Sequence, residues 1–225
     1  MNQNLSPLEK LKILVIDDHE IVLGGTIDAI KQKYAQAEIF TAQTAQTALE
    51  RLQQDNFNLV VMDLSLPDKP GVTAKVDTGI QLLKTSLKNY PTLNIVVQST
   101  YVRALVRVIP DIDAHKGGFT VADKSLSSKE MLTRVDWALQ GLTYTKALKN
   151  LQTGLELKPE WLTVLILAFE EGLQDKAIAE KMNLSERMIR NYWHKVQDAL
   201  GVYPGEGKNI RIQTQMRARE EGLID

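Results

Sequence analysis

The sequence predicts an α/β fold, built on a doubly wound, five-stranded parallel sheet, followed by a small all-α domain. Apolar runs rich in Ile and Val alternate with amphipathic segments about five times between residues 10 and 142. From residue 157 onward the hydrophobic pattern is helical throughout. The chain has 225 residues, which is enough for two domains that each bury a core.

The strands of the first domain are predicted from five apolar runs. The first, "LKILVIDD", is almost continuously apolar, as expected of a strand that is buried on both faces of a parallel sheet. Right-handed crossovers between parallel strands leave few other arrangements, so helices are expected on both faces of this sheet. The five runs cover residues 11–18, 37–42, 57–63, 93–99 and 118–124.

Three segments between these runs, and a fourth after the last run, have the spacing of amphipathic helices. Gly24 and Gly25 weaken the pattern of the first segment, because glycine lowers helix propensity. Ser127 and Glu130 form a capping-box pattern that marks the start of the last helix. The four helical segments cover residues 20–34, 44–54, 79–90 and 128–140.

Three further segments fit this alternation less simply. Residues 67–79, "PDKPGVTAKVDTG", form a long connection that either contacts a binding partner or is a neutral surface insertion. Residues 99–118 carry an apolar helix face, which belongs either to the core or to a dimer interface. Residues 143–156 lose strand character and are predicted to be a partly helical linker between domains at 10–142 and 157–225.

Polar side chains fall at or just beyond the ends of the predicted strands. In open parallel sheets, the ligand site lies at the carboxyl ends of the strands. Two carboxylates about 4 Å apart repel each other by roughly 4 kcal/mol at an effective dielectric of 20, so a cation must offset them. Mg²⁺, which prefers oxygen ligands, and a lysine ammonium group would both do so. The side chains concerned are those of Asp17, Asp18, Asp63, Ser99 and Lys124.

This set of residues predicts phosphoryl chemistry. With its charge partly neutralised, Asp63 can attack a phosphorus atom and become an acyl phosphate. Mg²⁺ and Lys124 would stabilise the charge on the transferring group, and Ser99 could hydrogen-bond a phosphoryl oxygen. His19 is expected to cap a helix or pack beside the acids, and His115 stands in a loop without a ligand set, so neither indicates zinc.

The first domain resembles the receiver domain of two-component response regulators, which has a flavodoxin-like fold. The resemblance covers about residues 10–142 and rests on "VIDDHE", "VVMDLSLP", "IVVQS" and "DKSLSSKEML". It implies that a sensor histidine kinase phosphorylates Asp63 and that Ser99 and Lys124 contact the phosphoryl group. It also implies that Mg²⁺ is held by Asp17, Asp18, Asp63 and the backbone carbonyl of Ser65.

The second domain is predicted to be a helix-turn-helix domain. Its helical segments cover residues 159–172, 174–183, 184–201 and 210–222. Ser185 is expected to be the N-cap of the third helix, and Gly201 is expected to end it. A short helix, the tight turn "MNLS" and a longer reading helix make up the motif. The buried stripe of the reading helix is predicted to be Ile189, Trp193, Val196 and Leu200.

The opposite side of this reading helix carries the candidate contacts to double-stranded DNA. Arginine suits guanine and asparagine suits adenine in the major groove, while hydroxyl and cationic groups bind phosphates. The candidates are Ser185, Arg187, Arg190, Asn191, His194 and Lys195. Residues 207–219 add basic side chains without an acid, although acids slightly outnumber bases over 157–225. This domain resembles the LuxR/NarL-type output domain, with an insertion at 203–213.

These features predict a cytoplasmic transcriptional regulator controlled by phosphorylation, acting as a homodimer when phosphorylated. The chain has 27 Lys and Arg residues against 28 Asp and Glu, so any nucleic-acid binding must be local. It has no cysteine, and no signal peptide or membrane segment is recognised. One alternative is a receiver-gated module whose helical domain binds protein rather than DNA. An aspartyl phosphatase is disfavoured, because those enzymes carry an acid where Ser65 stands, so no enzyme is predicted.

Overall fold

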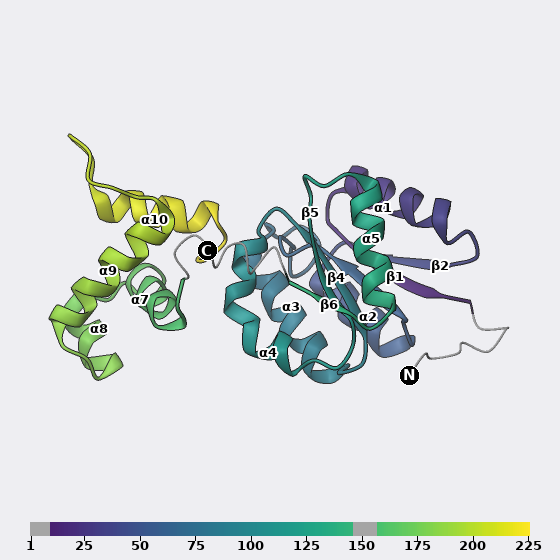
Figure 1. Cartoon of the computed structure of the whole chain (residues 1–225), viewed down its shortest axis with the longest axis horizontal. Helices are drawn as coiled ribbons and strands as arrows, with labels where there is room; N and C mark the ends of the chain where they lie inside the picture. The colour runs from purple at the N-terminus through teal and green to yellow at the C-terminus, as the bar shows by residue number, and fades with distance from the viewer. Residues whose placement is uncertain (1–9, 146–156) are drawn as a thin grey trace. The chain divides into compact units, whose positions relative to one another are not determined.

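The computed structural model describes residues 10–145 and 157–225 (Figure 1). These residues form two compact units, one of residues 10–102 and 108–145 and the other of residues 103–107 and 157–225. The first contains a parallel sheet with its helices, and the second contains the C-terminal helices. The predicted linker falls between them, and its residues 146–156 lie outside the described part of the chain.

The sheet of the first unit has the strand order β2-β1-β3-β4-β5-β6, with every neighbouring pair parallel. Residues 13–16 of β1 and all of β3 are Ile, Leu, Val or Met and are buried on both faces, which explains the near-continuous apolar runs of these strands. The strands are β1 (Lys12–Ile16), β2 (Glu38–Ala42), β3 (Leu59–Met62), β4 (Asn94–Ser99), β5 (Phe119–Asp123) and β6 (Thr143–Tyr144).

Helices cover both faces of this sheet, as predicted. Helices α1 and α5 contact each other and share one apolar cluster with alternate residues of β1, β3, β4 and β5. Helix α2 contacts α3, and α3 contacts α4, on the other face. The helices are α1 (Glu20–Lys33), α2 (Ala45–Gln54), α3 (Val76–Asn89), the 3-10 helix η1 (Val102–Val108), α4 (Ile109–Ala114) and α5 (Ser128–Leu139). The capping box of Ser127 and Glu130 at the start of α5 is confirmed.

The sheet has six strands, one more than predicted. Residues 143 and 144, expected in the linker, pair with Phe119 and Thr120 of β5. The Tyr144 ring also lies 4.5 Å from the Trp137 ring, and the guanidinium carbon of Arg134 lies 4.2 Å from the Tyr144 ring centre. A strand of two residues is too short to show a hydrophobic period, so the sequence does not reveal it. Its contacts with α5 and with the edge of β5 hold it in place.

Helix α3 begins at Val76, three residues before the predicted start at Gly79. The long connection before it is closed by an antiparallel bridge between Leu66 and Lys75. Gly79 fits where a side chain would not, because a Cβ atom there would lie 1.9 Å from the carbonyl oxygen of Leu64. The first turn of α3 therefore packs directly on the backbone that follows Asp63.

Residues 99–118 do not form one regular helix. The 3-10 helix η1 is followed by the short helix α4, whose first turn contains Pro110. Proline has no backbone N–H, so it starts a helix readily but cannot continue a preceding one. The apolar face predicted from this segment is thus divided between two short elements.

The second unit consists of α7 (Pro159–Phe169), α8 (Asp175–Met182), α9 (Glu186–Leu200) and α10 (Ile210–Glu220). Pro159 occupies the first turn of α7, as predicted. The predicted stripe of α9 is buried in one apolar core with residues of α7, α8 and α10. That stripe is Ile189, Trp193, Val196 and Leu200.

A turn of three residues, 183–185, joins α8 to α9, so the predicted short helix, tight turn and longer helix follow one another in the structure. Asn183 ends α8 in the left-handed conformation, with φ of 54°. Ser185 is the N-cap of α9, and its hydroxyl accepts a hydrogen bond of 3.2 Å from the backbone N–H of Met188. Gly201 ends α9 with φ of 64°, as the sequence predicts.

Candidate functional site

The candidate site lies at the carboxyl ends of the adjacent strands β1 and β3. Asp17 directly follows β1, and Asp63 directly follows β3. The backbone N–H of Asp63 donates to the carbonyl oxygen of Ile16 at 2.9 Å, so sheet hydrogen bonding continues up to the site. Both carboxylates are almost fully buried, with exposed fractions of 4% for Asp17 and 3% for Asp63. Two buried carboxylates require a compensating cation.

Lys124 provides positive charge to both acids. Its Nζ atom lies 2.7 Å from Oδ2 of Asp17 and 2.7 Å from Oδ2 of Asp63. Lys124 reaches this position because Asp123, the last residue of β5, pairs with Ser99 at the end of β4. The backbone N–H of Lys124 then donates to the carbonyl oxygen of Ser99 at 3.3 Å. Residues far apart in the sequence thus meet at one edge of the sheet, as predicted.

The protonation of Lys124 follows from this geometry. Burial lowers the pKa of its ammonium group, but hydrogen bonds to Asp17 and Asp63 and the charges of these acids raise it by more. The net effect is a pKa above the ordinary value of lysine. Lys124 therefore carries its charge at any physiological pH.

Asp18 and His19 complete an acidic cluster beside Asp17. One possible ligand atom from each of the three residues lies within 4.8 Å of the others. Nδ1 of His19 is 2.8 Å from Oδ1 of Asp18. This contact lacks hydrogen-bond geometry, so Oδ1 of Asp18 is shielded from solvent and has no hydrogen-bond partner. His19 stands at the N-cap position of α1 without capping it, so it packs beside the acids. An unsatisfied carboxylate oxygen among other carboxylates suits a hard cation.

Ser99 and Ser65 are the remaining residues predicted at this site. Ser99 is fully buried, and its Oγ atom accepts a hydrogen bond of 3.1 Å from the backbone N–H of Tyr101. Ser65 is half-buried and follows Asp63 by two residues. Direct side-chain contacts thus join Asp17, Asp63 and Lys124, while a backbone contact joins Ser99 to Lys124.

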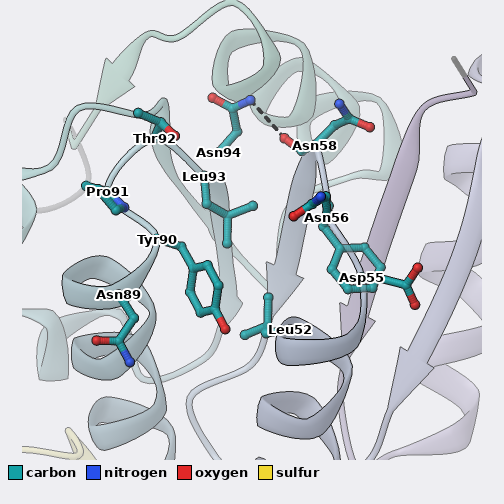
Figure 2. A pocket seen from close by; sticks show the side chains of 11 residues that line it. Leu52, Asp55, Asn56, Asn58, Asn89, Tyr90, Pro91, Thr92, Leu93 and Asn94 are labelled. Atoms are coloured by element: carbon teal, nitrogen blue, oxygen red, sulfur yellow. Dashed lines mark hydrogen bonds between the residues drawn. The ribbon is translucent and has the colours of Figure 1, made fainter.

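A separate cavity of about 320 Å³ opens at the other end of the sheet, where β3 and β4 begin (Figure 2). Two of its asparagines satisfy strand ends: Asn94 donates its amide to the carbonyl oxygen of Asn58 at 2.8 Å, and Asn58 accepts from the backbone N–H of Lys12. These roles are structural, and the residues that line the cavity do not include Asp17, Asp18 or Asp63.

All six residues predicted to contact DNA are exposed along α9 or at its N-cap. The buried stripe faces the core, so the candidates project from the rest of the helix surface. This agrees with the predicted arrangement, while DNA contact by these side chains stays a prediction. The exposed residues are Ser185, Arg187, Arg190, Asn191, His194 and Lys195.

The structure also contains a cluster that the sequence did not indicate. Arg211 of α10 makes two hydrogen bonds to Asp175 of α8, at 2.7 and 2.8 Å. Its guanidinium carbon lies 3.6 Å from the centre of the Trp193 ring, and Trp193 donates its indole N–H to Asp175. The cluster connects α8, α9 and α10. The charge of Arg211, one of the cations in the basic segment 207–219, is therefore paired within the domain.

Residues 13–136 match the family described as the response regulator receiver domain. The chain belongs to the response regulator receiver family. The sequence-based resemblance to receivers is thereby confirmed, and the acidic site lies within the matched part of the receiver. None of the helices in the described ranges, 10–145 and 157–225, is long and apolar enough to cross a membrane.

Several known proteins match this chain over most of its length and most of their own. DevR/DosR of Mycobacterium tuberculosis, named a DNA-binding transcriptional activator, is 25% identical over 85% of this chain and 89% of that protein. ComA of Bacillus subtilis, named a transcriptional regulatory protein, is 24% identical over 95% of this chain and 99% of ComA. A solved structure of RcsB from Salmonella enterica serovar Typhimurium, bound to a promoter in the presence of a phosphomimetic, is also similar. The match covers 94% of this chain and 99% of the RcsB chain, with 22% identity and a TM-score of 0.62. The predicted fold class is thus confirmed, apart from the sixth strand.

Proposed function

We propose that this protein is a response regulator in which phosphorylation of Asp63 controls transcription through DNA binding by the helix-turn-helix domain. The observation that carries the proposal is the buried Asp63, which shares the ammonium group of Lys124 with Asp17 at the carboxyl ends of the strands. A buried carboxylate held between an acid and a lysine is suited to accept a phosphoryl group. A sensor histidine kinase would supply that group.

The residues of the site fit a hard divalent cation. Carboxylate and carbonyl oxygens are the ligands that Mg²⁺ prefers, and the unsatisfied Oδ1 of Asp18 offers one more donor. Mg²⁺ would be held by Asp17, Asp18, Asp63 and the carbonyl oxygen of Ser65. When bound, it would neutralise charge on the incoming phosphoryl group.

The protein's own groups account for the remaining requirements of the transfer. A carboxylate oxygen of Asp63 forms the new bond to phosphorus as the bond from phosphorus to the phosphohistidine nitrogen of the kinase breaks. Lys124 can then donate to a phosphoryl oxygen in place of a carboxylate oxygen. The hydroxyl of Ser99 acts as acceptor from Tyr101, so its own proton remains able to donate to the phosphoryl group.

The output step would use the exposed side of α9. The positions of Arg190, Asn191 and Lys195 suit contacts to base edges and phosphates in the major groove. Names of relatives support this: DevR/DosR is called DNA-binding, and RcsB was solved on a promoter. A phosphorylated homodimer would place two reading helices one turn of DNA apart. Such a regulator would act in the cytoplasm, as a phosphoacceptor rather than as an enzyme with turnover.

The test begins with phosphorylation. The protein is incubated with acetyl phosphate and Mg²⁺, and intact-mass analysis should show one added phosphoryl group. Asp63→Asn keeps the size of the side chain but removes the nucleophile, so it should show none. Light scattering should then detect dimers in the phosphorylated wild type only. Equal labelling of wild type and Asp63→Asn would contradict the assignment.

A second candidate is a receiver-gated module whose helical domain binds protein. The observation that favours it is charge pairing: Arg211 pairs with Asp175, and Arg217 pairs with Glu220 and Glu221. This pairing leaves less positive charge for phosphates. DNA binding would make affinity fall steeply with salt, so mobility shifts at several salt concentrations distinguish the two functions.

A further inference from the structure

A buried polar pair joins helix α1 to strand β4 behind the phosphorylation site. The hydroxyl of Thr26 donates to the side-chain oxygen of Gln98 at 3.1 Å. Only 4% of Thr26 is exposed, and Gln98 is half-buried. Neither residue belongs to the set that would contact metal or phosphate.

The position of the pair in the fold relates it to the site. Helix α1 begins at Glu20, directly after the acids Asp17 and Asp18, and Gln98 directly precedes Ser99. In the sheet, β3 lies between β1 and β4. The Thr26–Gln98 hydrogen bond therefore spans the strand that ends at Asp63, and it connects α1, which follows the acidic loop, to the strand that carries Ser99.

The surroundings of the pair are apolar. Side chains alternate along a strand, so Gln98 points to the same face as Val96, which packs with Ala29 and Ile30 of α1 and with α5. Two apolar side chains of similar size would pack there without needing a hydrogen bond to offset burial. A polar pair restricts how α1 and β4 can slide past each other, because the bond requires one relative placement.

We infer that Thr26 and Gln98 are positioning residues for phosphoryl transfer, which fix Ser99 and Lys124 relative to the acidic loop. The inference rests on the proposed function of Asp63. Gln98 pairs with Ala122 of β5, and the backbone of Lys124 binds that of Ser99, so both phosphate-contacting groups follow the placement of β4. Small misplacements of reacting groups slow transfer steeply.

The experiment measures the rate of phosphorylation of the full chain by acetyl phosphate at several Mg²⁺ concentrations. In this reaction a carboxylate oxygen of Asp63 forms a bond to phosphorus while the bond from phosphorus to acetate breaks, and acetate leaves. Intact-mass analysis gives the labelled fraction against time. Circular dichroism sets a temperature at which every variant is fully folded.

Thr26→Val and Gln98→Leu each remove the hydrogen bond and are expected to lower the maximal rate 5- to 10-fold. The half-saturating Mg²⁺ concentration should change less than twofold, because Asp17, Asp18 and Asp63 follow β1 and β3 rather than β4. The double variant should be no slower than the slower single variant, since both lose the same bond. Thr26→Ser keeps the hydroxyl and should stay within twofold of wild type.

Ser86→Ala is the matched control. Ser86 is also a buried helical hydroxyl of the receiver, 1% exposed, but it donates to the carbonyl oxygen of Leu82 within α3. It should lower the melting temperature without slowing phosphorylation. A purely structural role for Thr26 would make Thr26→Val behave in the same way.

The possible outcomes separate this inference from the function on which it rests. If wild type is never labelled, the proposed function fails. If wild type is labelled and both Thr26→Val and Gln98→Leu match its maximal rate within twofold, the positioning role is overturned. Should either variant fail to fold, Thr26→Ala and Gln98→Met carry the same expectation and the same overturning result.

Discussion

Lys124 determines the charge balance of the receiver site at the scale of single residues. Its ammonium group is bound by two buried carboxylates, and removing it would leave two negative charges in a poorly solvated position. A buried carboxylate that loses its cationic partner becomes costly, whereas the loss of an exposed ion pair costs little. Stability and chemistry therefore depend on the same side chain.

Lys124→Met tests this charge balance. We expect a loss of about 1–3 kcal/mol in the free energy of unfolding at pH 7, because two buried acids lose their partner. Urea titrations of wild type and variant at pH 7 measure it, and an unchanged free energy of unfolding would contradict the charge argument.

The raised pKa of Lys124 also predicts how the free energy of unfolding of the wild type changes at alkaline pH. A lysine that binds its proton more tightly in the folded state contributes stability fully below its unfolded pKa, which is about 10.5. That stability is lost as pH rises through the higher folded pKa. As pH rises above about 10.5, Lys124→Met should accordingly lose less stability than the wild type does. Unfolding followed by circular dichroism at several alkaline pH values measures this difference.

At the scale of elements, Gly79 shows how the first turn of α3 supports the phosphoacceptor. A methyl group at Gly79 would meet the carbonyl oxygen of Leu64 at 1.9 Å, so Gly79→Ala must displace α3 or the segment after Asp63. Overpacking of this kind costs typically about 1–3 kcal/mol. Thermal unfolding should show the loss, and phosphorylation by acetyl phosphate should slow.

Gly24→Ala is the control for this prediction. A Cβ atom at Gly24 would have no neighbour within 4 Å, and the residue lies inside α1. Alanine should therefore raise stability slightly, by about 0.5–1 kcal/mol, because it favours helix more than glycine does. A similar loss in both variants would mean that close packing does not explain Gly79.

The N-cap of α9 separates helix stability from DNA binding. Ser185→Ala removes the acceptor for the N–H of Met188 and should cost about 1 kcal/mol of stability. Ser185→Asp keeps a capping oxygen, so stability should be retained, but its charge would repel a DNA phosphate. Urea unfolding and mobility shifts together test this, and tight DNA binding by Ser185→Asp would exclude a phosphate near this position.

The elements that the sequence predicts correctly are those with their own local signal. The buried strands show continuous apolar runs, α5 shows a capping box, and α9 shows a stripe ending at Gly201. Strand β6 lacks such a signal, because two residues have no period and depend on contacts with β5 and Trp137. The break between η1 and α4 was not predicted because the apolar pattern continues through it.

For the molecule as a whole, strand order determines which residues meet. The rule that ligand sites form at carboxyl strand ends predicts that Asp17, Asp63 and Lys124 converge, but not that one ammonium group binds both acids. Pairings across separate elements, such as Thr26 with Gln98 or Arg211 with Asp175, have no spacing that a single sequence reveals. Such contacts depend on how complete elements pack.

DNA recognition is also a property of the whole domain, since it depends on which cations the fold leaves exposed. Arg190 is exposed on α9, whereas Arg217 on α10 lies 3.0 Å from Glu220 and 2.7 Å from Glu221. These two arginines form a matched pair, because alanine removes one charge in each case. If α9 reads DNA, only the first substitution removes a contact.

Arg190→Ala should therefore weaken promoter binding. If Arg190 contacts a phosphate, the slope of log affinity against log salt should fall by about 1. If it contacts a base, specificity at one base pair should relax at a cost of about 1–3 kcal/mol. Arg217→Ala should leave affinity within twofold, because its charge is already balanced by two carboxylates. Mobility shifts with phosphorylated protein at four salt concentrations measure both. Equal effects of the two substitutions would indicate a general electrostatic attraction, and no effect of either would favour a protein partner for this domain.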